Sequence, residues 1–294
     1  MDKWNLIVDI DRCNNCGNCS LAALDEHVGN DFPGYAAAQP KQALPLIEIR
    51  RNVRGSGEHV DMAYMPAMCN HCDRPRCAEG ADGAVTKRAD GIVLIDPVKA
   101  KGRRDLVDKC PHGAIQWNEE QQVPQVWIFD AHLLDAGWKE PRCQQACPSG
   151  AFRAVKLSDQ RMQALAREEG LEVSRPELGT APRVYYKNLQ RMTRRFIAGS
   201  VVKLEAGTPD CLQGCTVTLA LDGAQVAQTS TDWFGDFKFD GLVYEALSYT
   251  LTFEHAGYAP VRLSVVTDVS GKNVDVVALT PASATAGAPS TATA

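Results

Sequence analysis

Long apolar runs are missing from this sequence of 294 residues, and so is the pattern of a cleavable export signal. The first residues, MDKWNLIVDIDRC, lack a cationic segment followed by an apolar core and a small-residue cleavage site. A helix that spans a bilayer needs about 20 consecutive apolar residues. We therefore expect no membrane segment and a cytoplasmic location, with export in complex with a signal-carrying partner as the alternative.

Three motifs of catalytic chains are absent as well, namely the nucleophile elbow, the P-loop and HExxH. The 31 basic and 36 acidic residues are mixed along the chain and give a net charge of -5. No polybasic face therefore indicates nucleic acid or an anionic membrane surface, and the basic run 50–54 is expected to be a solvated face. The hydrophobic share of 45% is enough for buried cores. We expect a globular chain without catalytic residues of its own.

Cysteine, in contrast, is abundant, with eleven residues in the chain. Nine of them lie between Cys13 and Cys147, while Cys211 and Cys215 flank a turn far downstream and are expected to be reduced structural residues. Clustered cysteines in a chain without an export signal indicate metal sites before disulfides.

The cysteine spacing matches that of iron-sulfur ferredoxins. These use the run CxxCxxCxxxCP, in which three cysteines bind one cluster and the fourth binds the other. Four such runs can be aligned here. The first contains Cys13, Cys16, Cys19 and then Ala23, and the second, with a longer third gap, contains Cys69, Cys72, Cys77 and then Ala81. The third contains Ala100, Arg103, Leu106 and then Cys110, and the fourth contains Trp127, Asp130, Cys143 and then Cys147.

If the first run exchanges with the fourth, and the second with the third, two complete sets of ligands result. The sequence thus predicts two 4Fe-4S clusters, held by Cys13, Cys16, Cys19, Cys147 and by Cys69, Cys72, Cys77, Cys110. An exchange of Cys110 and Cys147 satisfies the same count, so this pairing stays open. Two further sites have lost their ligands, and we expect Arg103, Leu106 and Trp127 to fill those volumes. Cys143 is expected to be a leftover thiol.

Two alternatives to iron-sulfur clusters stay open. Zinc is the main one, because CxxC pairs also bind zinc and His71 and His112 lie beside cysteines. A disulfide framework is less favoured in a chain of this size without an export signal. His71, His112 and His132 are interpreted as hydrogen-bonded structural groups rather than ligands.

The first 157 residues have short strand patterns between Gly and Pro turns, with strand candidates at 5–11, 91–96, 113–117 and 150–155. Gly-Ala followed by an apolar residue recurs in DGAVTK, CPHGAI and CPSGAF, which indicates duplicated small modules. Residues 158–170 begin with Ser, contain helix formers and end with Gly, so one helix is predicted. Residues 171–197 have no clean period and are expected to cross the surface of the module or of a partner.

From residue 198 to 280 the pattern changes to alternating strands. Seven runs are expected, at 200–206, 215–223, 224–232, 235–242, 248–258, 261–268 and 273–279. Their regular turn signals favour an antiparallel β-sandwich or small barrel. TDWFGDFKFDGL and YTLTFEHAGY resemble the transthyretin-like family of seven-stranded modules, which bears on fold and not on activity. The tail 281–294 is small and polar and is expected to be disordered.

The expected fold class is α+β, with four parts. These are a double ferredoxin-like iron-sulfur domain at 1–157, a helix and docking linker at 158–197, the β-sandwich module at 198–280 and the tail at 281–294.

Several segments resemble the iron-sulfur small (beta) subunits of the dimethyl sulfoxide reductase family of molybdenum enzymes. They are CNHCDRPRC, GIVLID, CPHGAI and AHLLDAGWKEPRCQQACP. DEHVGNDFPGY, DGAVTK, PELGTAPRVYYKNL and the β-module resemble, within that family, the branch of pyrogallol-phloroglucinol transhydroxylase and resorcinol hydroxylase. Together these segments cover nearly the whole chain.

The resemblance implies a large catalytic partner subunit that holds molybdopterin guanine dinucleotide and hydroxylates or transhydroxylates polyphenols, in a heterodimer or larger complex. Electron-transfer subunits of this family usually hold four clusters, whereas here the pattern leaves one in each half. Two roles therefore stay open: an electron-transfer subunit, also of another molybdenum oxidoreductase, and a structural subunit with redox-silent clusters. A free-standing ferredoxin is a weaker third.

Overall fold

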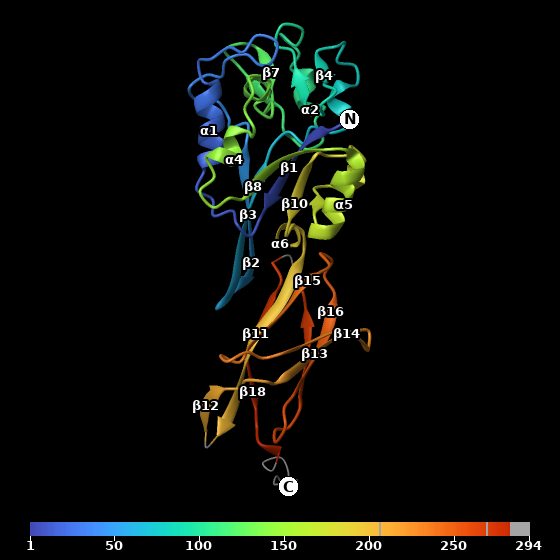
Figure 1. Ribbon diagram of the computed structural model, residues 1–294. Helices are drawn as coiled ribbons and strands as arrows, with labels where there is room; N and C mark the ends of the chain where they lie inside the picture. Colours follow the sequence, from blue (N-terminus) through green and yellow to red (C-terminus); the bar gives the residue numbers. More distant parts are fainter. Residues whose placement is uncertain (206, 269, 283–294) are drawn as a thin grey trace. The chain divides into compact units, whose positions relative to one another are not determined.

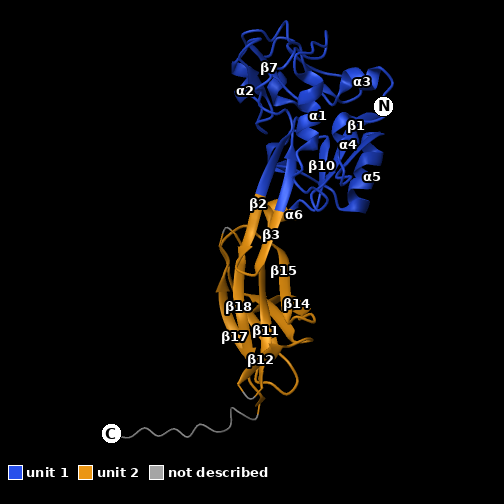
Figure 2. Ribbon diagram, turned by 90° about the vertical axis from the view of Figure 1, so that its left-hand side faces the viewer, with its two compact units in different colours: residues 1–51, 63–189 blue, residues 52–62, 190–294 orange. Residues whose placement is uncertain are grey.

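The computed structural model describes residues 1–205, 207–268 and 270–282. It divides into two compact units (Figure 2), of which the first contains residues 1–51 and 63–189 and the second contains residues 52–62 and the chain from 190 onward. Residues 158–189 belong to the first unit, so the structure does not set the expected segment 158–197 apart. The other expected boundaries stay predictions, and the expected disordered tail lies outside the described residues from residue 283 onward.

The first unit contains a four-stranded sheet in the order β8, β1, β10, β9, of which Figure 1 labels β8, β1 and β10. Its strands are β8 (Phe152–Leu157), β1 (Lys3–Asp9), β10 (Val184–Lys187) and β9 (Glu172–Val173). The strand β1 pairs antiparallel with β8 and parallel with β10, and its Leu6 and Val8 are fully buried. Hydrophobic burial of this central strand is the main force that holds the sheet together.

Helix α5 (Asp159–Glu169) covers this sheet through a core of Ile7, Met162 and Leu171. The hydroxyl of Ser158 accepts a hydrogen bond from the amide of Arg161, and Gly170 ends the helix with a φ of 63°. A left-handed residue at this position suits glycine, which has no Cβ. The helix predicted at 158–170 is thereby confirmed.

Strand β10 corrects the expectation for residues 171–197. It lies between β1 and β9, and its Val184 and Tyr186 are buried. The segment is therefore part of the sheet and does not merely cross a surface. Sequence periodicity missed it because a strand of four residues, Val184–Lys187, is too short to display a pattern.

The rest of the first unit consists of short elements joined by loops. The helices are α1 (Asn18–His27), α2 (Asp105–Asp108), α3 (Ala131–Asp135) and α4 (Arg142–Gln145), with 3-10 turns η1 (Arg76–Ala78) and η2 (Pro176–Leu178). Two small antiparallel hairpins pair β4 (Val85–Lys87) with β5 (Val93–Ile95) and β6 (Gln116–Asn118) with β7 (Val123–Gln125). Six of the nine cysteines up to residue 147 lie in the loops between these short elements, and the other three, Cys19, Cys77 and Cys143, lie within α1, η1 and α4.

The second unit contains two four-stranded sheets that share one core. In the first, β11 (Arg195–Glu205) pairs antiparallel with β12 (Thr208–Cys211) and β15 (Asp236–Leu242) and parallel with β18 (Lys272–Leu279). The second has the antiparallel order β14 (Ala224–Ser230), β13 (Thr216–Leu221), β16 (Ser248–Glu254), β17 (Val261–Val266). Alternate residues of β16 point inward, namely Tyr249, Leu251 and Phe253. Each of the seven expected strands is present, and β12 and the short helix α6 (Gln190–Thr193) are additional.

The basic run 50–54 is not simply a solvated face, because it belongs to the hairpin of β2 (Glu48–Ser56) and β3 (His59–Ala67). Arg54 is only 2% exposed and donates hydrogen bonds to Asp61 and Asp240 within the second unit. Gly55, at the turn, has a φ of 83°, and a Cβ there would lie 2.0 Å from the carbonyl oxygen of His59. The turn therefore requires glycine.

Candidate metal centres

The two Cys-Pro repeats fold into the same turn, at residues 110–114 and 147–151. In each, the glycine has a positive φ, 69° and 62°, and its amide donates to the carbonyl of the cysteine at 3.0 and 3.2 Å. The alanine that follows donates its amide to the cysteine sulfur at 3.4 and 3.3 Å. Donors aimed at sulfur favour the thiolate, which is the form that binds metal.

The structure brings Cys110 to the three cysteines of the second run. We call Cys69, Cys72, Cys77 and Cys110 the Cys69 group. Burial raises the pKa of the Cys69 thiol well above its usual value, and the nearby Cys110 raises it further. Burial followed by Cys110 and Cys72 raises the pKa of Cys77 to about 12. These interactions place the four sulfurs near one another, with Cys69 buried and the other three partly exposed.

Cys147 lies beside the first run, and we call Cys13, Cys16, Cys19 and Cys147 the Cys13 group. Burial, then the neighbouring Cys147 and Cys16, raises the pKa of Cys13. Burial, then Cys13 and Cys16, raises the pKa of Cys19 to about 11. Burial also acts on Cys147, but hydrogen bonds from Ser149 and nearby amides outweigh it and lower the pKa of this thiol. In the arrangement of the chain, each isolated cysteine thus joins a triplet from a distant run.

The chemistry of these donors fits 4Fe-4S clusters, which are held by four thiolates. All eleven cysteines are free thiols. Among the residues that the structure describes, no three His, Cys, Asp or Glu side chains converge closely enough to hold a single metal ion. The thiolates of a cubane bind different iron atoms and need not converge in that way. Whether the eight thiols bind clusters stays a prediction.

Ordinary side chains fill one of the two sites that have lost their ligands. Ala81, Ala100 and Leu106 are fully buried. Arg103 does not fill that volume, contrary to expectation, because its guanidinium points toward Asp105 at 2.8 Å and remains 28% exposed. A buried arginine would need a compensating charge. At the surface, Arg103 pairs with Asp105 without the desolvation cost of burial.

The other such site is equally closed. Trp127 is fully buried and stacks on Phe129 with ring centroids 4.9 Å apart. Asp130 is 1% exposed, and burial raises the pKa of its carboxyl to about 6. Cys143 is buried beside it. The indole of Trp127 therefore occupies space that a cluster would need.

Sequence reasoning missed a segment that holds the Cys69 group, which we call the clasp and define as residues 175–183. Its backbone pairs with the loop that carries the cysteines: the amides of Asp73 and Arg74 donate to the carbonyls of Ala181 and Thr180 at 2.8 and 3.0 Å. At its end, the amide of Arg183 donates to the carbonyl of Asn70 at 2.8 Å. A separation of about a hundred residues leaves no local pattern that could reveal this pairing.

Side chains add to the clasp. Arg175 donates to the carbonyl of Pro111 at 2.5 Å, and Arg76 donates to the carbonyl of Leu178 at 2.8 Å. The clasp therefore contacts both parts of the Cys69 group, the triplet loop and the Cys-Pro turn.

The three singled-out histidines make hydrogen bonds. The Nδ1 atom of His71 accepts from the amide of Val93 at 3.1 Å, and the Nε2 atoms of His112 and His132 lie 3.0 Å from the hydroxyl of Thr180 and 2.8 Å from a carboxylate oxygen of Glu26.

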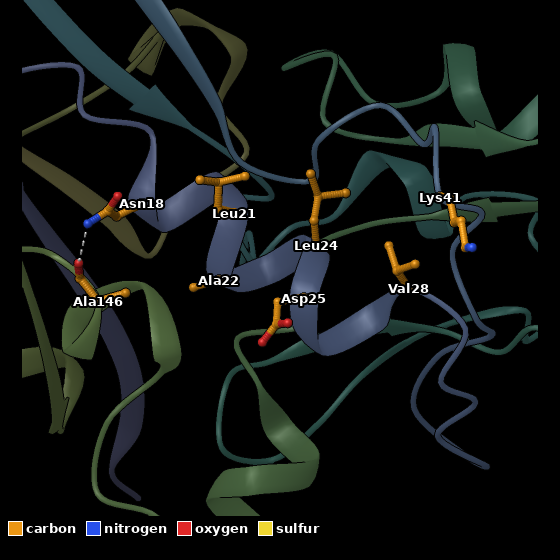
Figure 3. Close-up of a pocket in the computed structure, with 8 residues that line it drawn as sticks. All are labelled: Asn18, Leu21, Ala22, Leu24, Asp25, Val28, Lys41 and Ala146. Atoms are coloured by element: carbon orange, nitrogen blue, oxygen red, sulfur yellow. Dashed lines mark hydrogen bonds between the residues drawn. The ribbon is translucent and has the colours of Figure 1, made fainter.

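A surface depression of about 710 Å³ lies along α1 beside the Cys13 group (Figure 3). Leu21 lines it and is 61% exposed. At one end, the side-chain amide of Asn18 donates to the carbonyl of Ala146 at 3.3 Å. This bond ties the start of α1 to the residue before Cys147 and so joins the two parts of the Cys13 group.

Among the described residues, no helix combines the length and the apolar character needed to cross a membrane.

Comparison with known proteins agrees with this arrangement. Residues 60–157 match the family model of a 4Fe-4S dicluster domain. The chain is 40% identical over 279 residues to the pyrogallol hydroxytransferase small subunit of Pelobacter acidigallici, which covers 94% of this chain and 98% of that one. It is 30% identical over 192 residues to a tetrathionate reductase subunit of Salmonella typhimurium, covering 64% of this chain and 73% of the relative.

Among solved structures, a 5-hydroxyisourate hydrolase of Klebsiella pneumoniae is 20% identical and covers 29% of this chain and 86% of that one, with a TM-score of 0.24. A score this low carries no argument about the fold.

These matches define the class: the chain contains a ferredoxin-like 4Fe-4S domain of the kind found in iron-sulfur subunits of molybdenum oxidoreductases. Within the dimethyl sulfoxide reductase family of such enzymes, it belongs to the family of the pyrogallol hydroxytransferase small subunit.

Proposed function

We propose that this chain is the small subunit of a molybdopterin-dependent polyphenol hydroxytransferase or hydroxylase. The observation that carries the proposal is the 40% identity to a hydroxytransferase small subunit over 94% of the chain. Its partner is a large catalytic subunit that holds molybdopterin guanine dinucleotide and performs the hydroxyl chemistry, in a heterodimer or larger complex located in the cytoplasm. The second unit is a transthyretin-like module that supports this partner.

The Cys13 group and the Cys69 group each hold one 4Fe-4S cluster, so the chain holds two. The support is the grouping of thiols, since Cys147 neighbours Cys13 and Cys110 neighbours Cys69 and Cys77. Bound clusters of this kind accept and release single electrons. The residues of the chain supply the thiolates and direct amides toward the sulfurs of Cys110 and Cys147.

Hydroxyl transfer between two aromatic rings requires no net electrons, so the clusters of such an enzyme can act chiefly as supports for the loops that bind them. The closed sites around Leu106 and Trp127 favour this role, because they leave no room for intermediate clusters. The second candidate, an electron-transfer subunit, is favoured by the exposure of Cys16, which would place one cluster at a surface that a partner can reach.

Iron and sulfide analysis tests the cluster number. We expect about eight iron atoms and about eight sulfides per chain, because each cubane contains four of each. Cys72→Ser should lower both counts to about four, whereas Cys143→Ser, a matched change of a buried thiol outside both groups, should leave them unchanged. Zinc in place of iron, or loss of iron in Cys143→Ser, would contradict the ligand assignment.

Co-purification and substrate reduction test the rest. The affinity-tagged chain should retain a large molybdenum-containing subunit, and recovery of a lone chain would favour the free-standing ferredoxin instead. In the complex, we expect polyphenol substrate to leave the clusters oxidised on the timescale of turnover. Reduction of both clusters at the turnover rate would establish the electron-transfer role and refute the structural one.

A further inference from the structure

The two Cys-Pro turns differ in sequence at a single position. They are Cys-Pro-His-Gly-Ala at 110–114 and Cys-Pro-Ser-Gly-Ala at 147–151, so His112 in one turn corresponds to Ser149 in the other. In both turns the alanine amide donates to the cysteine sulfur, at 3.4 and 3.3 Å. Within the turns, a difference in what the two sulfurs receive can therefore come only from this position.

The hydroxyl of Ser149 lies 3.5 Å from the sulfur of Cys147, which is a hydrogen-bond distance for sulfur. A metal-bound cysteine sulfur is a thiolate and can only accept a hydrogen bond. A serine hydroxyl has one proton to donate, so with metal bound the hydroxyl is the donor and the sulfur is the acceptor. The Cys147 sulfur then has two donors, the amide of Ala151 and the hydroxyl of Ser149.

The side chain at the same position of the other turn makes a different contact. The Nε2 atom of His112 lies 3.0 Å from the hydroxyl of Thr180. The sulfur of Cys110 receives the amide of Ala114. In the part of the chain that the structure describes, no hydrogen bond joins the ring of His112 to this sulfur, so the turn at 110–114 lacks the side-chain donor that the turn at 147–151 has.

The backbone that follows Ser149 is held by the segment that leads into the first cysteine run. The guanidinium of Arg12 donates to the carbonyl of Gly150 at 3.1 Å, and the amide of Asp9 donates to the carbonyl of Ala151 at 2.8 Å. Because these bonds fix the turn, the hydroxyl is placed beside the sulfur by the fold. It needs little reorganisation when the charge on the sulfur changes.

We propose that Ser149 is a positioning residue that donates a hydrogen bond to the Cys147 sulfur and raises the reduction potential of the cluster held by the Cys13 group. The inference rests on the proposed function, since it requires that cluster. Reduction adds one electron to the cluster and increases the negative charge on its sulfurs, so a donor stabilises the reduced form more than the oxidised form. The bond acts on one of the two clusters and thus contributes to a difference between their potentials.

The experiment is a dithionite titration of the purified complex, followed by electron paramagnetic resonance, on wild type and three variants. Ser149→Ala removes the hydroxyl, and Ser149→Thr keeps it. His112→Ala is the matched control, because it truncates the corresponding side chain of the other turn, which has no bond to a sulfur. Iron is counted in every sample.

In Ser149→Ala we expect one potential to fall and the other to stay in place. A tenfold change in the equilibrium between reduced and oxidised forms corresponds to about 59 mV for one electron, and a fall of about this size is expected. Ser149→Thr should retain the wild-type value, and His112→Ala should shift neither potential by this amount.

A second readout observes the hydrogen bond itself. The hydroxyl proton exchanges with solvent, so electron-nuclear double resonance of the reduced complex in H2O and D2O should detect it beside the cluster. Ser149→Ala should lack one exchangeable proton signal that wild type and Ser149→Thr show.

Three results would overturn the inference. Unchanged potentials in Ser149→Ala with full iron content would show that the hydroxyl does not act on the cluster. An equal fall in Ser149→Thr or in His112→Ala would show that packing of the turn, and not the hydroxyl, sets the potential. Loss of iron from Ser149→Ala would show that the hydroxyl holds the turn instead of tuning the cluster. If wild type itself contains no iron in the Cys13 group, the proposed function fails, and this outcome is separate from the other three.

Discussion

Replacement of Arg183 by Met should loosen the loop that carries the Cys69 group. The Arg183 side chain is 3% exposed and donates to Asp73 at 2.7 Å, to Asn5 at 3.0 Å and to Asp159 at 2.6 Å. Asp73 directly follows Cys72, so its bond with Arg183 holds the loop. The other two bonds of Arg183 connect the loop to Asn5 in β1 and to Asp159 in α5. Methionine fills a similar volume but makes none of them.

The magnitude follows from what remains paired. Hydrogen bonds to charged groups contribute about 1.5–3 kcal/mol each, and breaking a buried ion pair costs about 3–5 kcal/mol. Asp73 keeps Lys87 at 3.0 Å, and Asp159 keeps Lys3 at 2.8 Å, so neither carboxylate is left alone. Asn5 is fully buried and loses a hydrogen-bond partner. We therefore expect a loss near the lower limit, about 3 kcal/mol in the free energy of unfolding of the first unit.

The assay combines urea unfolding with release of iron to a chelator. If iron leaves through local opening of the loop, about 3 kcal/mol corresponds to a release up to about 100-fold faster. Arg54→Met is the matched control, because Arg54 is 2% exposed and pairs with Asp61 and Asp240 in the second unit. It should lower the stability of that unit by a similar amount and leave iron release unchanged.

The reasoning fails if Arg183→Met releases iron at the wild-type rate, or if Arg54→Met accelerates release equally. The first result would show that the clasp backbone alone holds the loop. The second would show that iron loss follows global unfolding and not local opening of the loop.

Three further predictions concern parts of the chain outside the cysteine groups. Burial lowers the pKa of His27 to about 4 from its usual 6.5, so the unfolded chain binds more protons at this residue between these values, and His27 alone makes stability rise with pH there by about 3 kcal/mol. Burial raises the pKa of Asp130 to about 6 from its usual 3.8, which contributes a fall of nearly equal size, about 3 kcal/mol, between those values. The two contributions should largely cancel in wild type, so His27→Phe should make stability fall as the pH rises from 4 to 6 in urea titrations, and a variant with the pH dependence of wild type would contradict the assignment. Gly55→Ala should destabilise the second unit by about 3 kcal/mol or more, because a Cβ would lie 2.0 Å from a carbonyl oxygen, whereas Gly57→Ala meets only a side-chain amide at 3.0 Å and should cost about 1 kcal/mol; equal melting temperatures would refute this. Trp127→Ala should cost about 3–5 kcal/mol because the indole is fully buried, and a variant as stable as wild type in urea would show that the site collapses around the gap.

Local patterns were informative wherever the structure is determined locally. Helix α5 begins after Ser158 and ends before Gly170, as expected, because capping and left-handed termination depend on neighbours in sequence. Alternation predicted the strands of the second unit, because one face of each strand meets the shared core. The short strand β10 and the buried Arg54 were missed, because their environments come from residues far away in the chain.

In the candidate site, too, the locally determined features could be predicted from the sequence, and the features that depend on distant contacts could not. The triplet spacings and the Cys-Pro turns are visible in the sequence, since one loop places each triplet and a glycine of positive φ shapes each turn. The burial of Leu106 and Trp127 agrees with the expected filling of the sites that have lost their ligands, whereas Arg103 turns toward Asp105 at the surface. Charge decides this difference, because an arginine without a partner cannot be buried at acceptable cost.

The sequence by itself determined which thiols are available and in what numbers: three close together, twice, and one before a proline, twice. It left open which single cysteine joins which triplet, because spacing carries no information across a hundred residues. Only the tertiary structure decided this, by placing Cys147 beside Cys13 and Cys110 beside Cys69. It also revealed that the clasp pairs with the loop that follows Cys72, since contacts between distant segments form only when the sheet and the clasp fold together.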